Sequence, residues 1–372
     1  MPDETIAETS EGTLAFRVQR NPEPAPDAIR EAVLADPGFG RHFTDHMAVI
    51  DWTLEQGWHA ARFEPYGAFS IEPASAVLHY GQEVFEGLKA YRHPDGGVHL
   101  FRPERNAQRM RDSARRLGLP ELPVADFVAS VRGLVGLDEA WVPAAGEGRT
   151  LYLRPFLIAN ENFLGVRAAH TARYMVIACP AASYFQDATR PVDIWLSEHY
   201  SRAGRGGTGA AKCGGNYAAS LLPQRQAAER GCEQVLFLDA CEGRYLEELG
   251  GMNLCLVRRD GTILTPESDS ILPGITRDSL LELAQRAGLR VERRRVPIEE
   301  WREGAAAGDI VEAFACGTAA VVTPIGRLVA EGFTIEHPPL GEDSIGMRLR
   351  EELTGIQNGT LPDRLGWLVR AA

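Results

Sequence analysis

The chain has 372 residues, of which 44% are hydrophobic and 24% charged, with a formal net charge of -12. This length predicts two domains, and the composition is that of an ordinary globular protein. The acidic balance argues against binding to nucleic acid or an anionic membrane surface, while a local basic pocket for an anionic ligand stays open. No apolar run approaches the roughly 20 residues that span a bilayer.

The first ten residues are polar and acidic, without the basic start and apolar core of a signal peptide. None of the six cysteines forms a Cys-x-x-Cys pair, and no Cys/His cluster has zinc spacing. We therefore expect reduced thiols, a cytoplasmic location and no metal site.

In chain order, residues 1 to about 40 predict an arm over the surface, because they are rich in proline and acidic groups. Alternating apolar residues then predict strands at 47–52, 76–80 and 98–101. Helical spacing of apolar residues predicts helices at 104–117 and around 127–135. Apolar strands are expected at 150–158 and 174–178, and the turn-rich residues 182–191 predict an interdomain linker.

After this linker we expect strands at 192–196, 235–238 and 252–257, with a hairpin turn at 260–261. Helices are predicted at 216–230, 276–287, 298–306 and 343–353. Strands and helices mix without regular βαβ alternation, which predicts a two-domain α+β (mixed α/β) fold. The expected division is a small N-terminal α+β domain at 1–181, the linker at 182–191 and a large domain at 192–372.

Lys212 lies in a glycine-rich segment, 206–215, just before a predicted helix. Glycine lets the backbone approach a ligand closely. A P-loop needs Gly before its lysine and Ser or Thr after it, whereas Ala211 and Cys213 occupy those places, so that motif is excluded. From this segment alone, a ligand-binding lysine and a solvated lysine in a flexible loop are equally good interpretations.

Three further features suit an anionic ligand. The Gly-Ile-Thr sequence at 274–276 opens a predicted helix, whose first N–H groups and dipole favour anions, although an ordinary threonine N-cap is the commoner interpretation. A second turn, Gly-Thr at 317–318, separates two apolar strands. Arg109 could clamp a phosphate or lie on a solvated helix face. The residues alone predict a phosphate ligand near a lysine and do not name it.

An ordered set of motifs runs from about residue 44 to 359, nearly the whole chain. They are LHYGQEVFEGLKAYR at 78–92, LFRP at 100–103, NAQRM at 106–110, YLRP at 152–155, NENFLGV at 160–166, KCGGNY at 212–217, ELGGMN at 248–253, LPGITR at 272–277 and GTA at 317–319. This set resembles the branched-chain aminotransferases, which belong to fold type IV of the pyridoxal-phosphate enzymes. The resemblance makes residues 192–372 the cofactor-binding domain.

The resemblance implies that Lys212 carries pyridoxal 5'-phosphate covalently and later moves a proton between substrate and cofactor, for which it needs a lowered pKa. Glu248 is expected to pair with the pyridine nitrogen. On composition Glu247 could serve equally, and only the alignment of the resemblance favours Glu248 and leaves Glu247 solvated. The other expected cofactor contacts are Tyr217 to the phenolic oxygen, Leu272 to the ring face, and Arg109, Ile275 N–H, Thr276 N–H and Thr318 to the phosphate.

For the substrate, the resemblance implies apolar walls from Phe85, Tyr152 and Tyr184. It implies that a neighbouring subunit contributes Tyr80, Leu164 and Val166, which makes a homodimer the functional minimum. The substrate carboxylate is expected to meet the backbone N–H groups of Gly251 and Ala319 and the Tyr80 hydroxyl. Arg154 is expected to order the pocket and to assist the side-chain carboxylate of glutamate.

The sequence departs from the family pattern at two places. Ala320 and Thr323 stand where some members carry a redox-active Cys-x-x-Cys, so thiol regulation there is not expected. Gly251 stands where some members have threonine, so only its backbone N–H remains to make a contact.

The resemblance implies reversible transfer of the amino group of L-leucine, L-isoleucine or L-valine to 2-oxoglutarate, giving branched 2-oxo acids and L-glutamate. The alternatives are a D-amino-acid aminotransferase, an aminodeoxychorismate lyase and a non-catalytic binder of a phosphate ligand. The full motif set argues against the first two. Lys212 together with Glu248 argues against the third, because a binder needs no electron sink.

Overall fold

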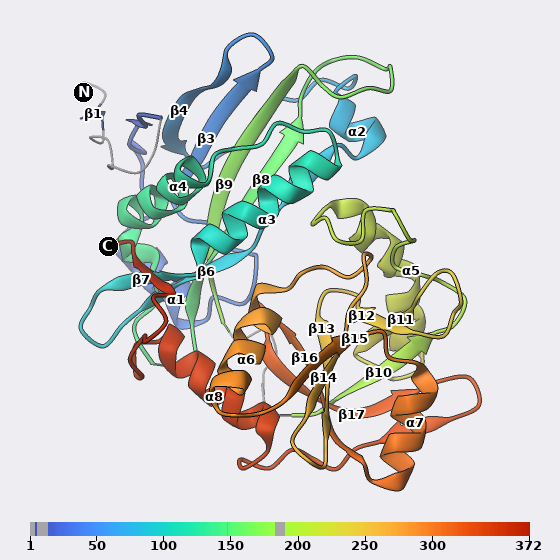
Figure 1. The fold of residues 1–372 in the computed structure, drawn as a ribbon. Coiled ribbons are helices and arrows are strands. Elements are labelled where there is room, and N and C mark those ends of the chain that lie inside the picture. The colour runs from blue at the N-terminus through green and yellow to red at the C-terminus, as the bar shows by residue number, and fades with distance from the viewer. Residues whose placement is uncertain (1–3, 6–13, 147, 183–189) are drawn as a thin grey trace. The chain divides into compact units, whose positions relative to one another are not determined.

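The computed structural model describes residues 4–5, 14–146, 148–182 and 190–372 (Figure 1). Within these residues the chain forms two compact units, each built around its own sheet. Unit 1 comprises Met1–Tyr184, Ala211–Gly214 and Ile356–Ala372. Unit 2 comprises Phe185–Ala210 and Gly215–Gly355.

The two units differ from the domains predicted from sequence, because two segments after residue 192 belong to unit 1. The four residues around Lys212 pack there because the Phe85 N–H donates to the Lys212 carbonyl over 2.9 Å. Residues 356–372 pack there because β19 (Leu368–Arg370) pairs with β7 (Val98–Phe101). Short returns leave no mark in composition, and most of the predicted linker lies outside the described residues.

The sheet of unit 1 runs in the order β1-β2-β4-β3-β9-β8-β6-β7-β19, with β5 paired to β8. Its pairs are antiparallel except β2 with β4. The remaining strands are β1 (Glu4–Thr5), β2 (Arg17–Val18), β3 (His46–Thr53), β4 (Gly57–Pro65), β5 (Glu83–Phe85), β6 (Leu88–Arg92), β8 (Thr150–Ala159) and β9 (Thr171–Ala181).

Two long helices of unit 1, α3 (Pro103–Arg116) and α4 (Val124–Leu137), pack on each other, and α4 lies against β3 and β9 (Figure 1). Pro103 suits the first helical position, and Ala107, Met110 and Ala114 recur at helical spacing, so one face of α3 is buried. The predicted helices at 104–117 and around 127–135 are confirmed. The short helices are α1 (Asp27–Ala35), α2 (Ala76–Tyr80) and a 3-10 turn (Glu139–Trp141).

The strand predicted at 76–80 is wrong, because these residues form helix α2. Its end is set by Gly81, which adopts the left-handed conformation with φ of 56° and donates its N–H to the Val77 carbonyl. A five-residue apolar run does not distinguish one helical turn from a strand, and the glycine that follows decides the outcome.

The sheet of unit 2 runs in the order β12-β11-β10-β17-β16-β13-β14-β15, with β18 paired to β17. Parallel pairs, such as β10 with β11, mix with antiparallel ones, such as β13 with β16. The strands are β10 (Val192–Ser197), β11 (Gln234–Leu238), β12 (Leu246–Leu249), β13 (Asn253–Arg258), β14 (Ile263–Pro266), β15 (Val291–Arg294), β16 (Ile310–Gly317), β17 (Val321–Val329) and β18 (Thr334–Glu336).

The helices after the predicted linker are α5 (Gly214–Glu229), α6 (Ile275–Arg286), α7 (Ile298–Ala307) and α8 (Ile345–Gln357). All four confirm predicted helices, with ends that differ by at most four residues. The prediction of a mixed fold without regular βαβ alternation is also confirmed. Each helix in the described part of the chain is too short or too polar to cross a bilayer.

Candidate active site

The Lys212 backbone is fixed to unit 1 on both sides. Its N–H donates to the Ser113 hydroxyl of α3 over 2.9 Å, and its carbonyl accepts the N–H of Phe85 on β5. Two residues later, the Gly214 N–H donates to the Glu83 carboxylate. A Cβ at Gly214 would lie 2.5 Å from that carboxylate, so this contact requires glycine. The lysine is therefore held on rigid elements and not in the flexible loop that composition also allowed.

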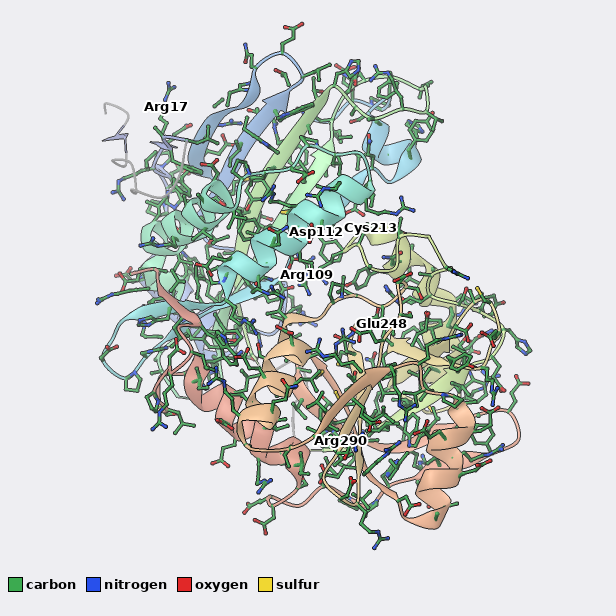
Figure 2. The ribbon with its side chains drawn as sticks, in the orientation of Figure 1. Arg17, Arg109, Asp112, Cys213, Glu248 and Arg290 are labelled. Atoms are coloured by element: carbon green, nitrogen blue, oxygen red, sulfur yellow. The ribbon has the colours of Figure 1, made fainter. Side chains whose placement is uncertain are left out.

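The Lys212 side chain is half-buried, and its Nζ lies 4.7 Å from the centroid of the Phe85 ring. Burial, and next the positive charge of Arg109, lower the pKa of the amine to about 8. A neutral amine is the nucleophilic form of lysine. A larger share of Lys212 is therefore neutral at mildly alkaline pH than of an ordinary lysine. Cys213, beside it in the chain, is buried in the core of unit 1 (Figure 2).

Arg109 extends from α3 (Figure 2). Its guanidinium forms a bidentate ion pair with the carboxylate of Glu86. Its Nε and one terminal nitrogen lie 2.7 and 2.8 Å from the two carboxylate oxygens. Glu86 is fully buried and also accepts a 2.8 Å bond from the Asn106 amide. The solvated helix face that composition allowed for Arg109 is therefore wrong. Glu86, which sequence reasoning left without a role, orients the arginine expected to bind phosphate.

The predicted substrate walls of unit 1 adjoin one another. The Arg154 guanidinium donates to the Tyr152 hydroxyl over 3.1 Å and lies 4.9 Å from the centroid of the Phe85 ring. A Cβ on Gly87 would lie 2.1 Å from the same hydroxyl, so glycine is required for this close approach. Phe39, which sequence reasoning missed, packs edge-on against Tyr152 with ring centroids 5.2 Å apart.

The three residues expected to serve a neighbouring subunit lie on the surface of unit 1. Tyr80 is 40% exposed, Leu164 66% and Val166 85%. The Tyr80 hydroxyl donates to the Leu164 carbonyl, so α2 and the 160–166 segment present one joint surface. In a single copy these apolar side chains are left in water, which is typical of surfaces that dock with a partner.

In unit 2, Glu248 is buried at the end of β12 among three partners. Arg202 lies 2.5 Å from one carboxylate oxygen, and the Leu272 N–H donates to the same oxygen over 2.7 Å. The Asn253 amide donates to the other oxygen over 3.2 Å. Neither Arg202 nor Asn253 was singled out from sequence, because their positions are 46 and 5 residues away from Glu248.

Glu247 is buried as well, so the expectation that it is solvated is wrong. One of its oxygens accepts bonds from the hydroxyls of Ser268 and Ser270, while the other has no hydrogen-bond partner within the described structure. Burial raises its pKa. Successive residues of a strand point to opposite faces of the sheet, so the side chains of Glu247 and Glu248 on β12 lie in different surroundings.

Helix α6 begins as the sequence predicted, with Ile275 and Thr276 in its first turn. The residue that caps it is Gly274, with φ of -70° and no side-chain cap, so the alternative of a threonine N-cap is wrong. A Cβ at Gly274 would lie 1.8 Å from the Asn253 amide oxygen. The first N–H groups of a helix have no partner within it, so this start offers donors for an anion.

The other predicted residues of unit 2 gather at the turn between β16 and β17. Thr318 and Ala319 lie in this turn, which closes with Gly317 opposite Val321. A Cβ on Gly317 would lie 3.6 Å from the Gly251 carbonyl oxygen, and one on Gly251 would lie 3.8 Å from the Tyr217 ring. These segments are therefore neighbours. Tyr184, expected in the substrate pocket, lies outside the described residues.

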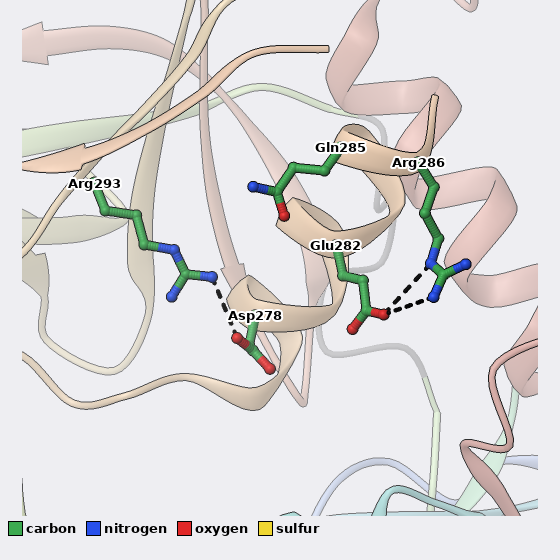
Figure 3. Close-up of a pocket in the computed structure, with 5 residues that line it drawn as sticks. All are labelled: Asp278, Glu282, Gln285, Arg286 and Arg293. Carbon is green, nitrogen blue, oxygen red and sulfur yellow. Dashed lines mark hydrogen bonds and ion pairs between the residues drawn. The ribbon is translucent and has the colours of Figure 1, made fainter. Parts of the chain in front are cut away.

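A pocket on the surface of unit 2 lies elsewhere, between α6 and β15 (Figure 3). Its charges are paired, with 3.2 Å between Asp278 and Arg293 and 3.2 Å between Glu282 and Arg286 (Figure 3). None of the predicted site residues lines it. In the described ranges no three His, Cys, Asp or Glu side chains are placed to hold a metal ion, and the six cysteines are free thiols.

The mixed two-unit fold agrees with what the comparisons show. The chain belongs to the class IV amino-transferase family, whose model matches residues 83–328. It is 56% identical over 365 residues to a branched-chain-amino-acid aminotransferase of Mycolicibacterium smegmatis, covering 96% of this chain and 99% of that protein. A protein of the same description from Mycobacterium tuberculosis is also 56% identical, with the same coverage.

Solved structures give the same result. The branched-chain amino acid aminotransferase of Escherichia coli has a TM-score of 0.70 and 26% identity, covering 87% of this chain and all of that one (100%). The branched-chain aminotransferase of Thermoproteus uzoniensis, solved with norvaline, has a TM-score of 0.70 and 25% identity with the same coverage. Other structures of such enzymes that this chain resembles were solved with pyridoxamine 5'-phosphate. The family, fold class, enzyme class and cofactor predicted from the motifs are confirmed.

Proposed function

We propose that this chain is a branched-chain-amino-acid aminotransferase that carries pyridoxal 5'-phosphate on Lys212. It transfers the amino group of leucine, isoleucine or valine to 2-oxoglutarate. The observation that carries this proposal is the Lys212 amine, whose lowered pKa and clamped backbone suit a covalent cofactor link. It is supported by relatives of that description at 56% identity over nearly the whole chain.

Four groups of the chain have the chemistry that the parts of this cofactor need. They are an amine, a buried guanidinium, a buried carboxylate and a helix start whose glycine cap leaves no room for a side chain. We assign the phosphate to Arg109, Ile275 N–H, Thr276 N–H and Thr318, the pyridine nitrogen to Glu248, the phenolic oxygen to Tyr217 and the ring face to Leu272. When bound, the cofactor supplies a carbonyl carbon for the lysine and a ring that accepts electrons.

The chain's own residues perform the remaining work. Lys212 Nζ takes the proton from the substrate Cα and delivers it to the cofactor from the same face, which its lowered pKa permits near neutral pH. Glu248, held by Arg202 and the Leu272 N–H, keeps a negative charge at a fixed place. Glu86 holds Arg109 in one orientation, so that the arginine presents its donors without reorganising.

For the substrate, we assign the apolar walls to Phe85, Tyr152 and Tyr184, with Arg154 beside them. The substrate carboxylate is assigned to the Gly251 and Ala319 N–H groups and the Tyr80 hydroxyl. We propose that Tyr80, Leu164 and Val166 complete the pocket of a second copy, because their apolar side chains are exposed in a single copy. The functional form is then a homodimer. A cytoplasmic location stays a prediction.

The test uses the fact that the chain contains only two lysines, Lys89 and Lys212. The purified protein should show a pH-dependent visible absorbance that L-leucine bleaches, and borohydride should fix the cofactor to the Lys212 peptide. Lys212→Ala should lose this absorbance and the 2-oxoglutarate-dependent formation of glutamate from leucine, while Lys89→Arg keeps both. Turnover by Lys212→Ala, or fixation on Lys89, would overturn the proposal. D-Alanine as the preferred donor would favour a D-amino-acid aminotransferase.

A further inference from the structure

Arg202 lies in unit 2, with its side chain only 3% exposed. One terminal nitrogen lies 2.7 Å from the Gly209 carbonyl oxygen, 3.0 Å from the Ser270 carbonyl oxygen and 2.5 Å from the Glu248 carboxylate. Its Nε is buried without a hydrogen-bond partner in the described structure. Burying a guanidinium costs free energy of folding unless an opposite charge balances it. The contacts of Arg202 with Glu248 and the two carbonyls therefore indicate its role.

The two carbonyls that Arg202 joins belong to the segments that carry predicted cofactor residues. Gly209 lies three residues before Lys212 in the chain, and Ser270 lies in the segment that leads to Leu272 and α6. These segments approach so closely that a Cβ on Gly209 would lie 2.1 Å from the Ser270 carbonyl oxygen. Both carbonyl oxygens accept from the same Arg202 nitrogen, which therefore holds the two segments together at this close approach.

The charge balance around Arg202 distinguishes the two adjacent glutamates. Both carboxyl groups are buried, and Arg202 makes its ion pair with Glu248. Glu247 accepts bonds from serine hydroxyls, and burial raises its pKa. An opposite charge within hydrogen-bonding distance favours the ionised form of a carboxylate. The charge of Arg202 also acts on Glu247, but its ion pair at 2.5 Å is with Glu248.

We propose that Arg202 is a positioning residue for the transamination reaction: it keeps Glu248 ionised and aimed, and the same nitrogen ties the segment before Lys212 to the segment before α6. This inference rests on the proposed function, in which Glu248 meets the cofactor nitrogen. The inference goes beyond the proposed function because it makes the state of Glu248 depend on Arg202, to which that function assigns no contact with substrate or cofactor.

The experiment compares Arg202→Gln, Arg202→Lys, Glu248→Gln and the double variant Arg202→Gln/Glu248→Gln in holoenzyme. Arg327→Gln serves as the control, because it removes an exposed arginine that pairs with Asp193. The readouts are kcat and KM for leucine, the pH titration of the bound cofactor's absorbance and the thermal unfolding of each protein.

Arg202→Gln should lower kcat about 10- to 100-fold with a smaller change in KM, as expected when a hydrogen-bonded charge is lost. It should also shift the spectroscopic titration in the same direction as Glu248→Gln. Arg202→Lys should recover part of the rate, since it keeps the charge but not the planar fork. If Arg202 acts through Glu248, the double variant should be no slower than Glu248→Gln alone, because the two losses are coupled.

Several outcomes would overturn this role. Losses that add in the double variant, or an Arg202→Gln enzyme with lowered unfolding temperature but an unchanged spectroscopic titration, would make Arg202 a purely structural residue. If Arg202→Gln does not fold, an Arg202→Lys enzyme with wild-type titration and rate would exclude any dependence on the guanidinium. A wild-type protein that binds no pyridoxal phosphate would instead refute the proposed function, so the two failures are distinguishable.

Discussion

Replacing Glu86 with glutamine tests whether the buried ion pair with Arg109 holds the phosphate-binding side of the site. Glu86 is fully buried and Arg109 is 8% exposed, so the substitution leaves a guanidinium in the interior without its counter-charge. Breaking a buried pair in this way destabilises a protein by about 3–5 kcal/mol. For a unit of this size, that corresponds to a melting temperature lowered by about 6–20 °C.

The assay is the thermal unfolding of apoprotein followed by tryptophan fluorescence. Glu121→Gln is the matched control, because Glu121 pairs with Arg115 on the same helix, α3, but near water. Water screens exposed pairs, so this variant should melt close to wild type. The charge of Glu86 also raises the pKa of Lys212, so Glu86→Gln should lower that pKa further. A Glu86→Gln protein that melts like Glu121→Gln, with the titration of Lys212 unchanged, would refute the reasoning.

Four further outcomes are expected. The rate at which pyridoxal phosphate attaches to apoprotein should rise as pH passes about 8, since burial lowers the pKa of Lys212 from 10.5, and a rise centred near 10.5 would contradict this. Because the unfolded chain then binds more protons between those values, the unfolding free energy of apoprotein should also increase with pH in that window. Glu248→Gln should slow leucine transamination by orders of magnitude and Glu247→Gln only mildly, whereas the reverse ranking in steady-state assays would exchange their roles. Gly274→Ala should lose cofactor on dialysis, since its Cβ would meet Asn253 at 1.8 Å, and full retention measured by absorbance would argue against an anion site at α6.

The parts of the fold that local pattern specifies were predictable. Helix α3 follows from apolar residues at helical spacing after Pro103, and β7 follows from alternation after a turn. Helix α2 was missed because a run of five residues carries no periodicity, and the returns of the chain to unit 1 were missed because they depend on pairing between distant segments.

The candidate site divides in the same way. Lys212 and the start of α6 could be found from glycine placement and turn chemistry, and the resemblance added the order of the other motifs. Arg202 and Glu86 were not found, because each acts through a partner that only the folded chain brings near. Glu247 was misjudged for a related reason: its neighbours Ser268 and Ser270 hide it from water, and nothing local in sequence shows that.

The way in which the chain passes repeatedly between its two units bears on its synthesis. A ribosome releases residues in order, and domains usually fold as units while they emerge. Here β7 stays an open sheet edge until residues 368–370 have been made, and open edges invite pairing with other chains. The stretch that carries the lysine is likewise made after most of the unit it docks on. The sheet of unit 1 is therefore incomplete during synthesis until residues 368–370 have been made, long after its other strands.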